Sequence, residues 1–334
     1  MKSNTGVLLV NLGSPDKPRF NAVYKYLTEF LNDPRVIDLP WHLRKFLVNG
    51  IIVPFRCAAS TKAYQKLWTD KGSPLIHWSR IQQQKLQYTL DDRAQVYLAM
   101  RYQNPSLTNT LEQIRKDGIT HLHIIPLFPQ YASATSGSVI DECMRIMRKW
   151  WVVPELHVVS DYYDHPDYIR AIVNRTSNLD LNSYDHILFS YHGLPMRQLD
   201  KVYKQGVCDD HDCTTEINET NSKCYMAQCY ATSRALAREL HINPSKYTVC
   251  FQSRLDKKWT EPFADKTIIR LAQQGARNIL VFSPAFVADC LETTIEIGEE
   301  YLELFREHGG ESLDLVPGIN DEQAFIACLA DLTA

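Results

Sequence analysis

The stretch "HILFSYHGLP", residues 186–195, decides the fold, because a run of strand-forming residues stops at a histidine and then turns. A largely apolar run without polar alternation is typical of a parallel strand that is buried on both faces. The run ends at His192, and Gly193 and Pro195 turn the chain. A lone histidine is most often a hydrogen-bonded core residue or an exposed strand end, so the rest of the chain must decide its role.

Similar runs recur along the whole chain, and amphipathic helical patterns separate them. The first half carries "GVLLVNL" (6–12), "QVYLAM" (95–100), "THLHIIPLF" (120–128) and "ELHVVS" (155–160). The second half adds "YTVCFQS" (247–253), "NILVFSP" (278–284) and "LDLVP" (313–317). Strands that alternate with helices predict an α/β fold with parallel sheets flanked by helices.

The order of these signals repeats between the two halves. Each half runs strand, Gly–Pro turn, strand ending in Arg, helix, and strand ending in Pro-x-Phe. We therefore expect two similar α/β lobes, over residues 1–160 and 161–334, with a cleft between them. The polar stretch "NRTSNLDLNSYD" (174–185) suits the connection. Open parallel sheets bind ligands beyond the carboxyl ends of their strands, and His192 lies at such an end.

Composition excludes several classes of function. The chain of 334 residues is 45% hydrophobic and 22% charged, which is typical of a globular protein. Its net charge of −3, with scattered Lys and Arg, argues against nucleic-acid binding. The absence of G-x-G-x-x-G does not support dinucleotide binding. No apolar run has the length of a signal peptide core or a membrane span, so we expect a cytoplasmic protein.

Five glutamates follow the seventh run, in "VADCLETTIEIGEEYLELF" (287–305), and three of them are evenly spaced. Glu292, Glu296 and Glu300 are four residues apart, so on a helix they form one acidic ridge. The plain interpretation is a solvated acidic face. The alternative is a ridge that faces His192, where carboxylates and an imidazole could handle a divalent cation and exchange protons.

Nine cysteines fall into two groups. Five are scattered and are expected to be small core residues, namely Cys57, Cys143, Cys250, Cys290 and Cys328. The other four, Cys208, Cys213, Cys224 and Cys229, are spaced C-x₄-C-x₁₀-C-x₄-C. Such thiolates suit zinc or an iron–sulfur cluster, and the spacing is looser than that of zinc ribbons. His211 could replace one ligand, and unligated or disulfide-bonded thiols remain alternatives. A packed core is the weakest interpretation, because the stretch is polar and acidic.

Together these motifs resemble the ferrochelatase family, whose members insert ferrous iron into a porphyrin in haem synthesis. The resemblance runs from about residue 5 to 330 and rests on "VLLVNLGSP" (7–15), "FSYHGLPMR" (189–197), "FQSR" (251–254) and "SPAFVADCLETTIEI" (283–297). It implies two Rossmann-like lobes around a porphyrin cleft. It also implies a lyase that forms nitrogen–metal bonds, takes Fe²⁺ and protoporphyrin IX, and releases two protons.

The resemblance also assigns roles to residues. His192 matches the active-site histidine, and we expect it to accept protons, with Glu292 as its carboxylate partner. Glu296 and Glu300 match glutamates that conduct metal or protons. The implied substrate-binding residues are Leu12, Arg56, Tyr64, Ser73, Arg101, Tyr102, Trp259 and Phe286. For the four clustered cysteines, which look like an insertion over residues 208–229 of the C-terminal lobe, the resemblance implies a [2Fe–2S] cluster, with zinc as the alternative.

Several alternatives stay open. The segment 38–59, "DLPWHLRKFLVNGIIVPFRCAA", is either a packed core helix and loop or the lip of the porphyrin mouth, touching the surface of the inner membrane. The enzyme could instead act on coproporphyrin III, cobalt or nickel, or the chain could be a non-catalytic haem or metal sensor. Glu292 stands where cobalt-type relatives carry a second histidine, which favours iron. The sequence does not predict the oligomeric state.

Overall fold

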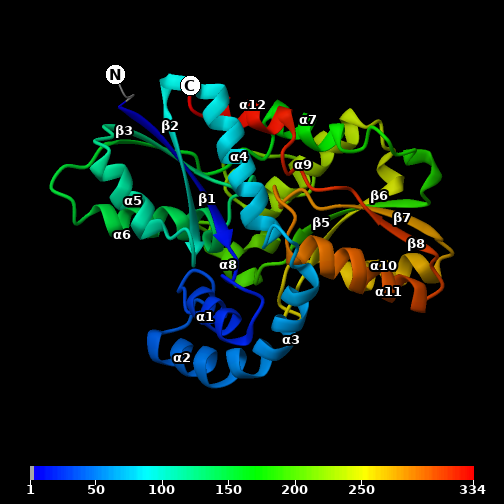
Figure 1. The fold of residues 1–334 in the computed structure, drawn as a ribbon. Helices are drawn as coiled ribbons and strands as arrows, with labels where there is room; N and C mark the ends of the chain where they lie inside the picture. The colour runs from blue at the N-terminus through cyan, green and yellow to red at the C-terminus, as the bar shows by residue number, and fades with distance from the viewer. Residues whose placement is uncertain (1–3) are drawn as a thin grey trace. The chain divides into compact units, whose positions relative to one another are not determined.

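The structure is a computed structural model that describes residues 4–334 and divides them into two compact units (Figure 1). Unit 1 contains the chain up to Phe128, residues Ala132–Asp161 and residues Ile326–Ala334. Unit 2 contains Pro129–Tyr131 and Tyr162–Phe325. The predicted lobes assign residues 326–334 to the second half, whereas the structure groups them with the first. The chain's last turns therefore return to the unit in which it began.

Unit 1 is built on a four-stranded parallel sheet in the order β2-β1-β3-β4. The strands are β1 (Thr5–Gly13), β2 (Gln95–Tyr102), β3 (His121–Pro126) and β4 (Glu155–Val158). The central strand β1 is almost wholly buried, with Val7 to Val10 fully inaccessible to solvent. This burial explains the unbroken apolar run, because both faces of a central parallel strand are covered by helices.

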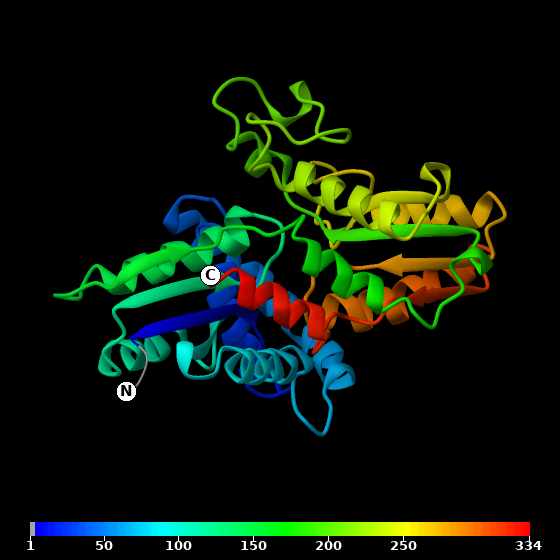
Figure 2. The same cartoon turned by 90° about the horizontal axis from the view of Figure 1, so that it is seen from above.

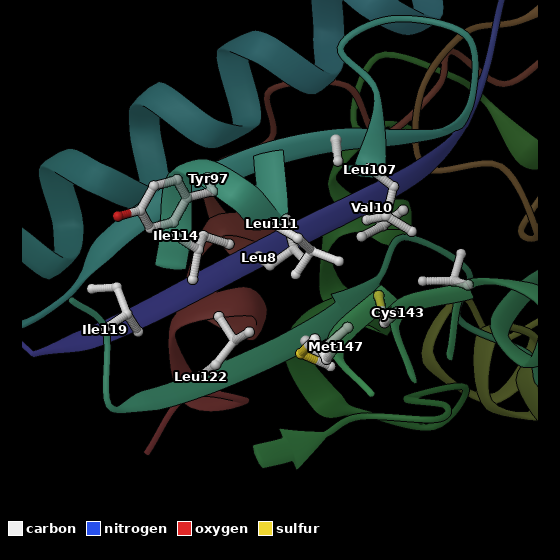
Figure 3. Packing of buried hydrophobic residues seen from close by; sticks show 13 residues of the cluster. Leu8, Val10, Tyr97, Leu107, Leu111, Ile114, Ile119, Leu122, Cys143 and Met147 are labelled. Carbon is white, nitrogen blue, oxygen red and sulfur yellow. The ribbon is translucent and has the colours of Figure 1, made fainter. Parts of the chain in front are cut away.

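Helices cover both faces of the unit 1 sheet. On one face α5 (Leu107–Lys116) and α6 (Ser138–Met147) pack on side chains of β1, β2 and β3, among them Leu8, Tyr97 and Leu122 (Figure 3). On the other face lies α4 (Pro74–Leu90), whose Ser79 accepts a hydrogen bond from Asn11 of β1 over 3.0 Å. A proline at the first turn starts α4, and the Ser106 hydroxyl caps α5 by accepting from the Asn109 amide.

A helical insertion lies between β1 and α4, at the carboxyl end of β1 (Figure 1). It comprises α1 (Phe20–Leu31), α2 (Trp41–Phe46), the π-helical η1 (Leu47–Ile52) and α3 (Val53–Leu67). Residues 41–59 of the predicted segment 38–59 are therefore helical. Its interpretation as packed core is wrong for the exposed residues Trp41, Leu43, Phe46, Ile51 and Phe55, which we call the α2–α3 patch.

Unit 2 repeats the same plan, with strand order β6-β5-β7-β8. The strands are β5 (His186–His192), β6 (Tyr247–Gln252), β7 (Asn278–Phe282) and β8 (Ser312–Leu315), all parallel. One face is covered by α10 (Ala264–Gln273), the π-helical η7 (Glu292–Tyr301) and α11 (Leu302–Glu307). Helix α9 (Tyr225–Glu239) covers the other face, where Ser233 bonds with the Tyr191 hydroxyl over 2.8 Å.

The remaining helical elements are shorter or connect these layers. They are η2 (Asp91–Arg93), η3 (Ser133–Gly137), α7 (Pro166–Asn174), η4 (Leu181–Ser183), α8 (Met196–Asp200), η5 (Cys208–Asp210), η6 (Pro244–Lys246) and α12 (Gln323–Asp331). Among residues 4–334, no helix combines the length and the apolar character that crossing a bilayer requires. All eight predicted strands are present, and the common strand order confirms the repeated α/β plan. Figure 2 shows helices on both sides of the unit 2 sheet.

Candidate functional site

His192 is the last residue of β5, at the carboxyl edge of the unit 2 sheet. Its ring is half-buried, and its Nδ1 lies 2.7 Å from the carbonyl oxygen of Gly193. A carbonyl oxygen can only accept a hydrogen bond, so the neutral ring carries its proton on Nδ1. The lone pair is therefore on Nε2. The geometry thus fixes the tautomer that can accept a proton or bind a cation at Nε2.

The turn after His192 depends on glycine because two backbones approach closely there. The Gly193 amide donates to the Gln252 carbonyl over 2.8 Å. A Cβ at position 193 would lie 2.9 Å from that oxygen and 3.3 Å from the Trp259 ring. The following residues are held too, because the Met196 amide donates to the Lys258 carbonyl over 2.9 Å. The close approach explains why the chain turns on Gly193. The two backbone hydrogen bonds hold the residues that follow His192 in place.

Gln252 connects His192 to the acidic segment. It ends β6 as the register partner of His192, and its Oε1 accepts from the Ser190 hydroxyl over 2.7 Å. Its Nε2 donates to the Glu292 backbone carbonyl over 3.0 Å and to Glu296 Oε2 over 3.1 Å. The side chain is almost fully buried. Gln252 therefore holds the start of η7 against the strand end that carries the histidine.

Glu296 accepts hydrogen bonds at both carboxylate oxygens. Oε1 accepts from the Ser253 amide over 3.0 Å and from the Tyr301 hydroxyl over 3.1 Å. Oε2 accepts from the Ser253 hydroxyl over 2.6 Å, in addition to the bond from Gln252. Ser253 adopts φ +60°, in the left-handed region that is uncommon outside glycine. A strained backbone is thus kept where it brings an amide to the carboxylate.

The three predicted ridge glutamates are not equivalent. They lie on or near one face of η7, but Glu292 and Glu296 are half-buried and Glu300 is exposed. The segment is a π-helix, which is rare and often found at functional sites. Burial and then the neighbouring Glu292 carboxylate raise the pKa of the Cys290 thiol, which hydrogen-bonds with Glu292. Glu296 is thus an anchored residue, whereas Glu292 contacts a thiol.

The residues predicted from the sequence to handle metal do not form a preformed metal site in the structure. In the part of the chain that the structure describes, no group of three or more His, Cys, Asp or Glu side chains is arranged to hold a metal ion. The structure does link His192 with Glu292 and Glu296, through Gln252. The metal-handling roles of His192, Glu292, Glu296 and Glu300 stay predictions.

Trp259 stands beside the histidine, with 6.5 Å between the two ring centroids. It also lines a cavity of about 580 Å³ together with Met196, Arg197, Asp200, Asp209, Met226, Lys257, Lys258 and Glu261. The indole and the two thioethers offer an apolar wall to a flat ligand, and the three cations of the lining are matched by three carboxylates. Phe286 is half-buried after β7 and lines a separate small cavity with Thr293.

The substrate residues predicted at the end of β2 belong to a buried network. Asp33 Oδ2 accepts from Arg101 Nη2 over 2.6 Å, from the Tyr102 hydroxyl over 2.9 Å and from the Ser138 hydroxyl over 2.5 Å. Arg101 Nε also donates to Ser138 Oγ over 2.7 Å. Burial, then the charge of Asp33, raises the pKa of Tyr102. The network joins β2, α6 and the loop after α1 within unit 1.

Burial disfavours direct substrate contact for three of the predicted residues. Tyr102 is 1% exposed and its hydroxyl donates to Asp33, so its side chain offers no surface to a substrate. Tyr64 and Ser73 are 7% and 4% exposed, so neither offers surface to a propionate. Leu12 is half-buried, and Arg56 is exposed on α3. The binding roles of these residues stay predictions.

The four clustered cysteines are buried, which contradicts the expectation that their stretch has little to pack with. Cys208, Cys213 and Cys224 form a small core with Leu199 and Tyr203, and Cys229 is buried near it and interacts electrostatically with Cys224 and Cys213. Hydrogen bonds from Cys208 and Cys213 lower the pKa of Cys224, and hydrogen bonds with Cys213 and Cys224 raise that of Cys208. We call this group the cysteine core. His211 stacks on Tyr203, with ring centroids 4.0 Å apart, so it stays close to the core without joining it.

Tyr225 connects the cysteine core with His192. Its hydroxyl donates to the His192 carbonyl over 2.9 Å and is in hydrogen-bond contact with the Cys229 sulfur. Burial is the main cause that raises the pKa of both Tyr225 and Cys229. Sequence reasoning assigned no role to Tyr225, Gln252, Ser253 or Asp33. The "FQSR" motif was the only signal for two of them, since it quotes Gln252 and Ser253 directly.

Comparisons with known proteins bear on the family and the fold of the chain. A family model described as Ferrochelatase matches residues 4–334. A ferrochelatase of Legionella pneumophila (strain Lens) is 42% identical over 328 residues, covering 98% of both chains. A ferrochelatase of Ectopseudomonas mendocina is 42% identical over 326 residues, covering 97% of this chain and 95% of the relative. One of Coxiella burnetii is 39% identical over 330 residues, covering 98% and 92%.

Solved structures share the fold at low sequence identity. The sirohydrochlorin chelatase SirB from Bacillus subtilis subspecies spizizenii in complex with cobalt aligns with a TM-score of 0.55 at 10% identity, over 99% of this chain and 95% of SirB. SirB from Bacillus subtilis with Fe³⁺ aligns with a TM-score of 0.51 at 12% identity, over 100% and 96%. These likenesses support the two Rossmann-like lobes. With the family model and the relatives, they lead to one conclusion: the chain belongs to the ferrochelatase family.

Proposed function

We propose that His192 accepts the pyrrole protons in a chain that, as a ferrochelatase family member, inserts ferrous iron into a porphyrin in haem synthesis. The observation that carries this proposal is the bond between His192 Nδ1 and the Gly193 carbonyl, because it leaves the lone pair on Nε2. An imidazole nitrogen with a free lone pair is a side-chain group that commonly accepts a proton in catalysis. The predicted cleft between the lobes is part of the proposal.

The reaction requires a proton acceptor. A free-base porphyrin loses two pyrrole protons as Fe²⁺ replaces them, and the ferrous substrate sheds its waters. His192 Nε2 accepts one proton at a time and passes it on, while Trp259 lies beside the ring and lines the apolar wall. Protoporphyrin IX, which is flat and largely apolar, suits an indole wall of this kind.

The three predicted ridge glutamates of η7 have different roles in this proposal. Glu296 is held by donors from Gln252, Ser253 and Tyr301, so it fixes the position of η7. Glu292 begins η7, and its backbone is held by Gln252. We assign to Glu292 the partner role, in which its carboxylate receives the ferrous substrate or a proton. Glu300, which is exposed, is the outer residue of this route.

The α2–α3 patch supplies the mouth of the site in this proposal. Phe55 and Phe46 are 81% and 69% exposed, although most large apolar side chains of the chain are buried. Such a patch suits a lip that receives a hydrophobic porphyrin at the membrane surface. In this proposal the protein is cytoplasmic and peripheral to the inner membrane. Arg56 receives a propionate, and Leu12 and Arg101 lie near the porphyrin.

The test compares H192A with H121A, a matched substitution of an exposed histidine in unit 1. Both variants receive Fe²⁺ and protoporphyrin IX under anaerobic conditions, and haem formation is followed by absorbance. We expect H192A to bind porphyrin with near-native affinity and to lose about 10²–10⁴-fold in kcat. H121A should behave like the native protein. A folded H192A that inserts iron at the native rate would refute the proposal.

The same assay decides between related functions. Native protein that turns over coproporphyrin III but not protoporphyrin IX would reassign the porphyrin. Faster insertion of cobalt or nickel than of iron would reassign the metal. Binding of porphyrin without turnover of any metal would make the chain a sensor. We expect iron and protoporphyrin IX to give the highest kcat/KM.

We also propose that the cysteine core holds a [2Fe–2S] cluster. Its four thiols are buried together, and contacts among Cys208, Cys213 and Cys224 favour a thiolate at Cys224, as ligands to iron require. The donor type therefore fits, although the sulfurs are not already placed around one point. Bound there, the cluster would tie the 208–229 insertion together. Two irons per chain with visible absorption, lost in C224S, support it; zinc in a colourless protein refutes it.

A further inference from the structure

A second exposed apolar segment lies in unit 1, in the loop between α6 and β4. Its sequence is "RKWWVV", residues 148–153, and we call it the 148–153 tip. Trp151 is 102% exposed, Val152 77% and Val153 48%. Figure 2 shows the loop as the green segment at the far left, where it extends beyond the strands of its sheet. The tip therefore presents three consecutive large apolar side chains to solvent.

The neighbouring tryptophan makes the tip a supported structure. Trp150 is half-buried and packs against the core formed by β1, β3, α5 and α6. Its amide donates to the Met147 carbonyl over 2.9 Å, which continues the last turn of α6. The two adjacent tryptophans thus point to opposite environments. Trp150 fixes the base of the tip, and Trp151 projects from it.

The charges around the tip are positive. Arg148 and Lys149 are exposed, and neither has an ion-pair partner within residues 4–334. The nearby acids are already engaged: Glu142 pairs with Arg145 at 2.6 Å, and Asp141 pairs with Arg35 at 3.3 Å. Glu155 lies 3.5 Å from His121. Apolar side chains at the apex therefore stand on a base with uncompensated positive charge.

We propose that the 148–153 tip docks the protein onto an anionic phospholipid surface. Trp151 and Val152 insert at the level of the headgroups, where tryptophan is enriched, and Arg148 and Lys149 contact lipid phosphates. A protein partner fits less well, because stable protein interfaces bury about 800 Å² on each side and are depleted in lysine. The proposal rests on the membrane contact of the proposed function and adds a second surface to the α2–α3 patch, one whose docking needs neither porphyrin nor iron.

The test measures co-sedimentation of the full chain with vesicles of phosphatidylcholine that contain about 30 mol % phosphatidylglycerol. The variants are W151E/V152E at the apex and K149E at the base. The control is Y88E, because Tyr88 is 89% exposed on α4, a different element. We expect native protein and Y88E to pellet equally and W151E/V152E to bind at least about tenfold more weakly. K149E should lose the preference for anionic over pure phosphatidylcholine vesicles.

Several results would overturn the proposal. Equal binding of W151E/V152E and native protein would show that the tip does not dock. Loss of binding only in F46E/F55E would move the contact to the α2–α3 patch. A change from oligomer to monomer in W151E/V152E, seen by sedimentation velocity without vesicles, would make the tip a contact between copies of this chain. Equal binding to both vesicle types would remove the electrostatic part.

Discussion

The carboxyl edges of the two sheets are built alike and differ in chemistry. In each sheet the first strand of the repeat lies in the centre, and a carboxylate holds the end of the second strand. In unit 1 the carboxylate of Asp33 binds Arg101 and Tyr102 at the end of β2. In unit 2 the carboxylate of Glu296 binds Gln252 and Ser253 at the end of β6.

The difference lies in the residue that ends the central strand. In unit 1, β1 ends at Gly13, where a Cβ would lie 2.0 Å from the Tyr102 carbonyl oxygen. In unit 2, β5 ends at His192, and the glycine that permits the close approach follows it. Moving the glycine by one position leaves room for an imidazole at the edge. The fold is thus repeated, but the central strand ends in glycine in unit 1 and in an imidazole that can accept a proton in unit 2.

Loss of the carboxylate in unit 1 should have the largest effect on stability. D33A leaves the largely buried Arg101 guanidinium without its partner, so we expect the free energy of unfolding to fall by about 3–5 kcal/mol. Urea denaturation measures it. The control is D141N, which removes the more exposed partner of Arg35 and should cost about 0–1 kcal/mol. Equal losses in both variants would show that the Asp33 network is not structural.

The corresponding change in unit 2 should be smaller. E296Q keeps the shape of the side chain but cannot accept all the bonds from Gln252, Ser253 and Tyr301, so we expect a loss of about 1–3 kcal/mol. E300Q, on the exposed part of the same helix, should cost less than about 0.5 kcal/mol. Denaturation curves of the two variants that coincide would contradict the anchoring role of Glu296.

A weaker effect is expected from the link between His192 and the cysteine core. Y225F removes the hydroxyl that bonds to the His192 carbonyl, which should cost about 0.5–1.5 kcal/mol of stability. It should also lower kcat more than it raises KM, because the imidazole is positioned less well. Y97F, which removes a tyrosine hydroxyl bonded to Asp117 in unit 1, is the control. A Y225F variant with native kcat and stability would show that this hydrogen bond neither stabilises the fold nor positions His192.

The smallest effect concerns pH, and it tests one histidine in each unit. Burial, then the neighbouring His157 and His121, lowers the pKa of His123. Burial, then Arg270 and Lys246, lowers the pKa of His186. A base with a lowered folded pKa stabilises the fold above its unfolded pKa, near 6.5, and this stability is lost as the pH falls below that value.

The measurement is unfolding free energy from pH 8 to about pH 5 for native protein, H123Q and H186Q. We expect the unfolding free energy of the native protein to fall on acidification, and that of each variant to fall less. A native curve that is flat, or that rises as the pH falls, would contradict the direction of both shifts.

The fold could be predicted well because the strands of buried parallel sheets consist of continuous apolar runs, which can be recognised locally in the sequence. The sequence predicted the position of His192 at a strand end for the same reason. It could not predict the contacts of Gln252, Ser253 or Asp33, since these join residues that are distant in sequence. Neither the π-helix over η7 nor the burial of Tyr64, Ser73 and Tyr102 has a local signature.

The most direct test of the account is the tautomer of His192, measured by nitrogen-15 NMR on protein with labelled histidine. The signal is assigned by its loss in H192Q, at a pH where histidine is neutral. Because the Gly193 carbonyl only accepts, the account predicts a proton on Nδ1 and an unprotonated Nε2. A neutral His192 that carries its proton on Nε2 would contradict it, since no lone pair would then be available there for a pyrrole proton.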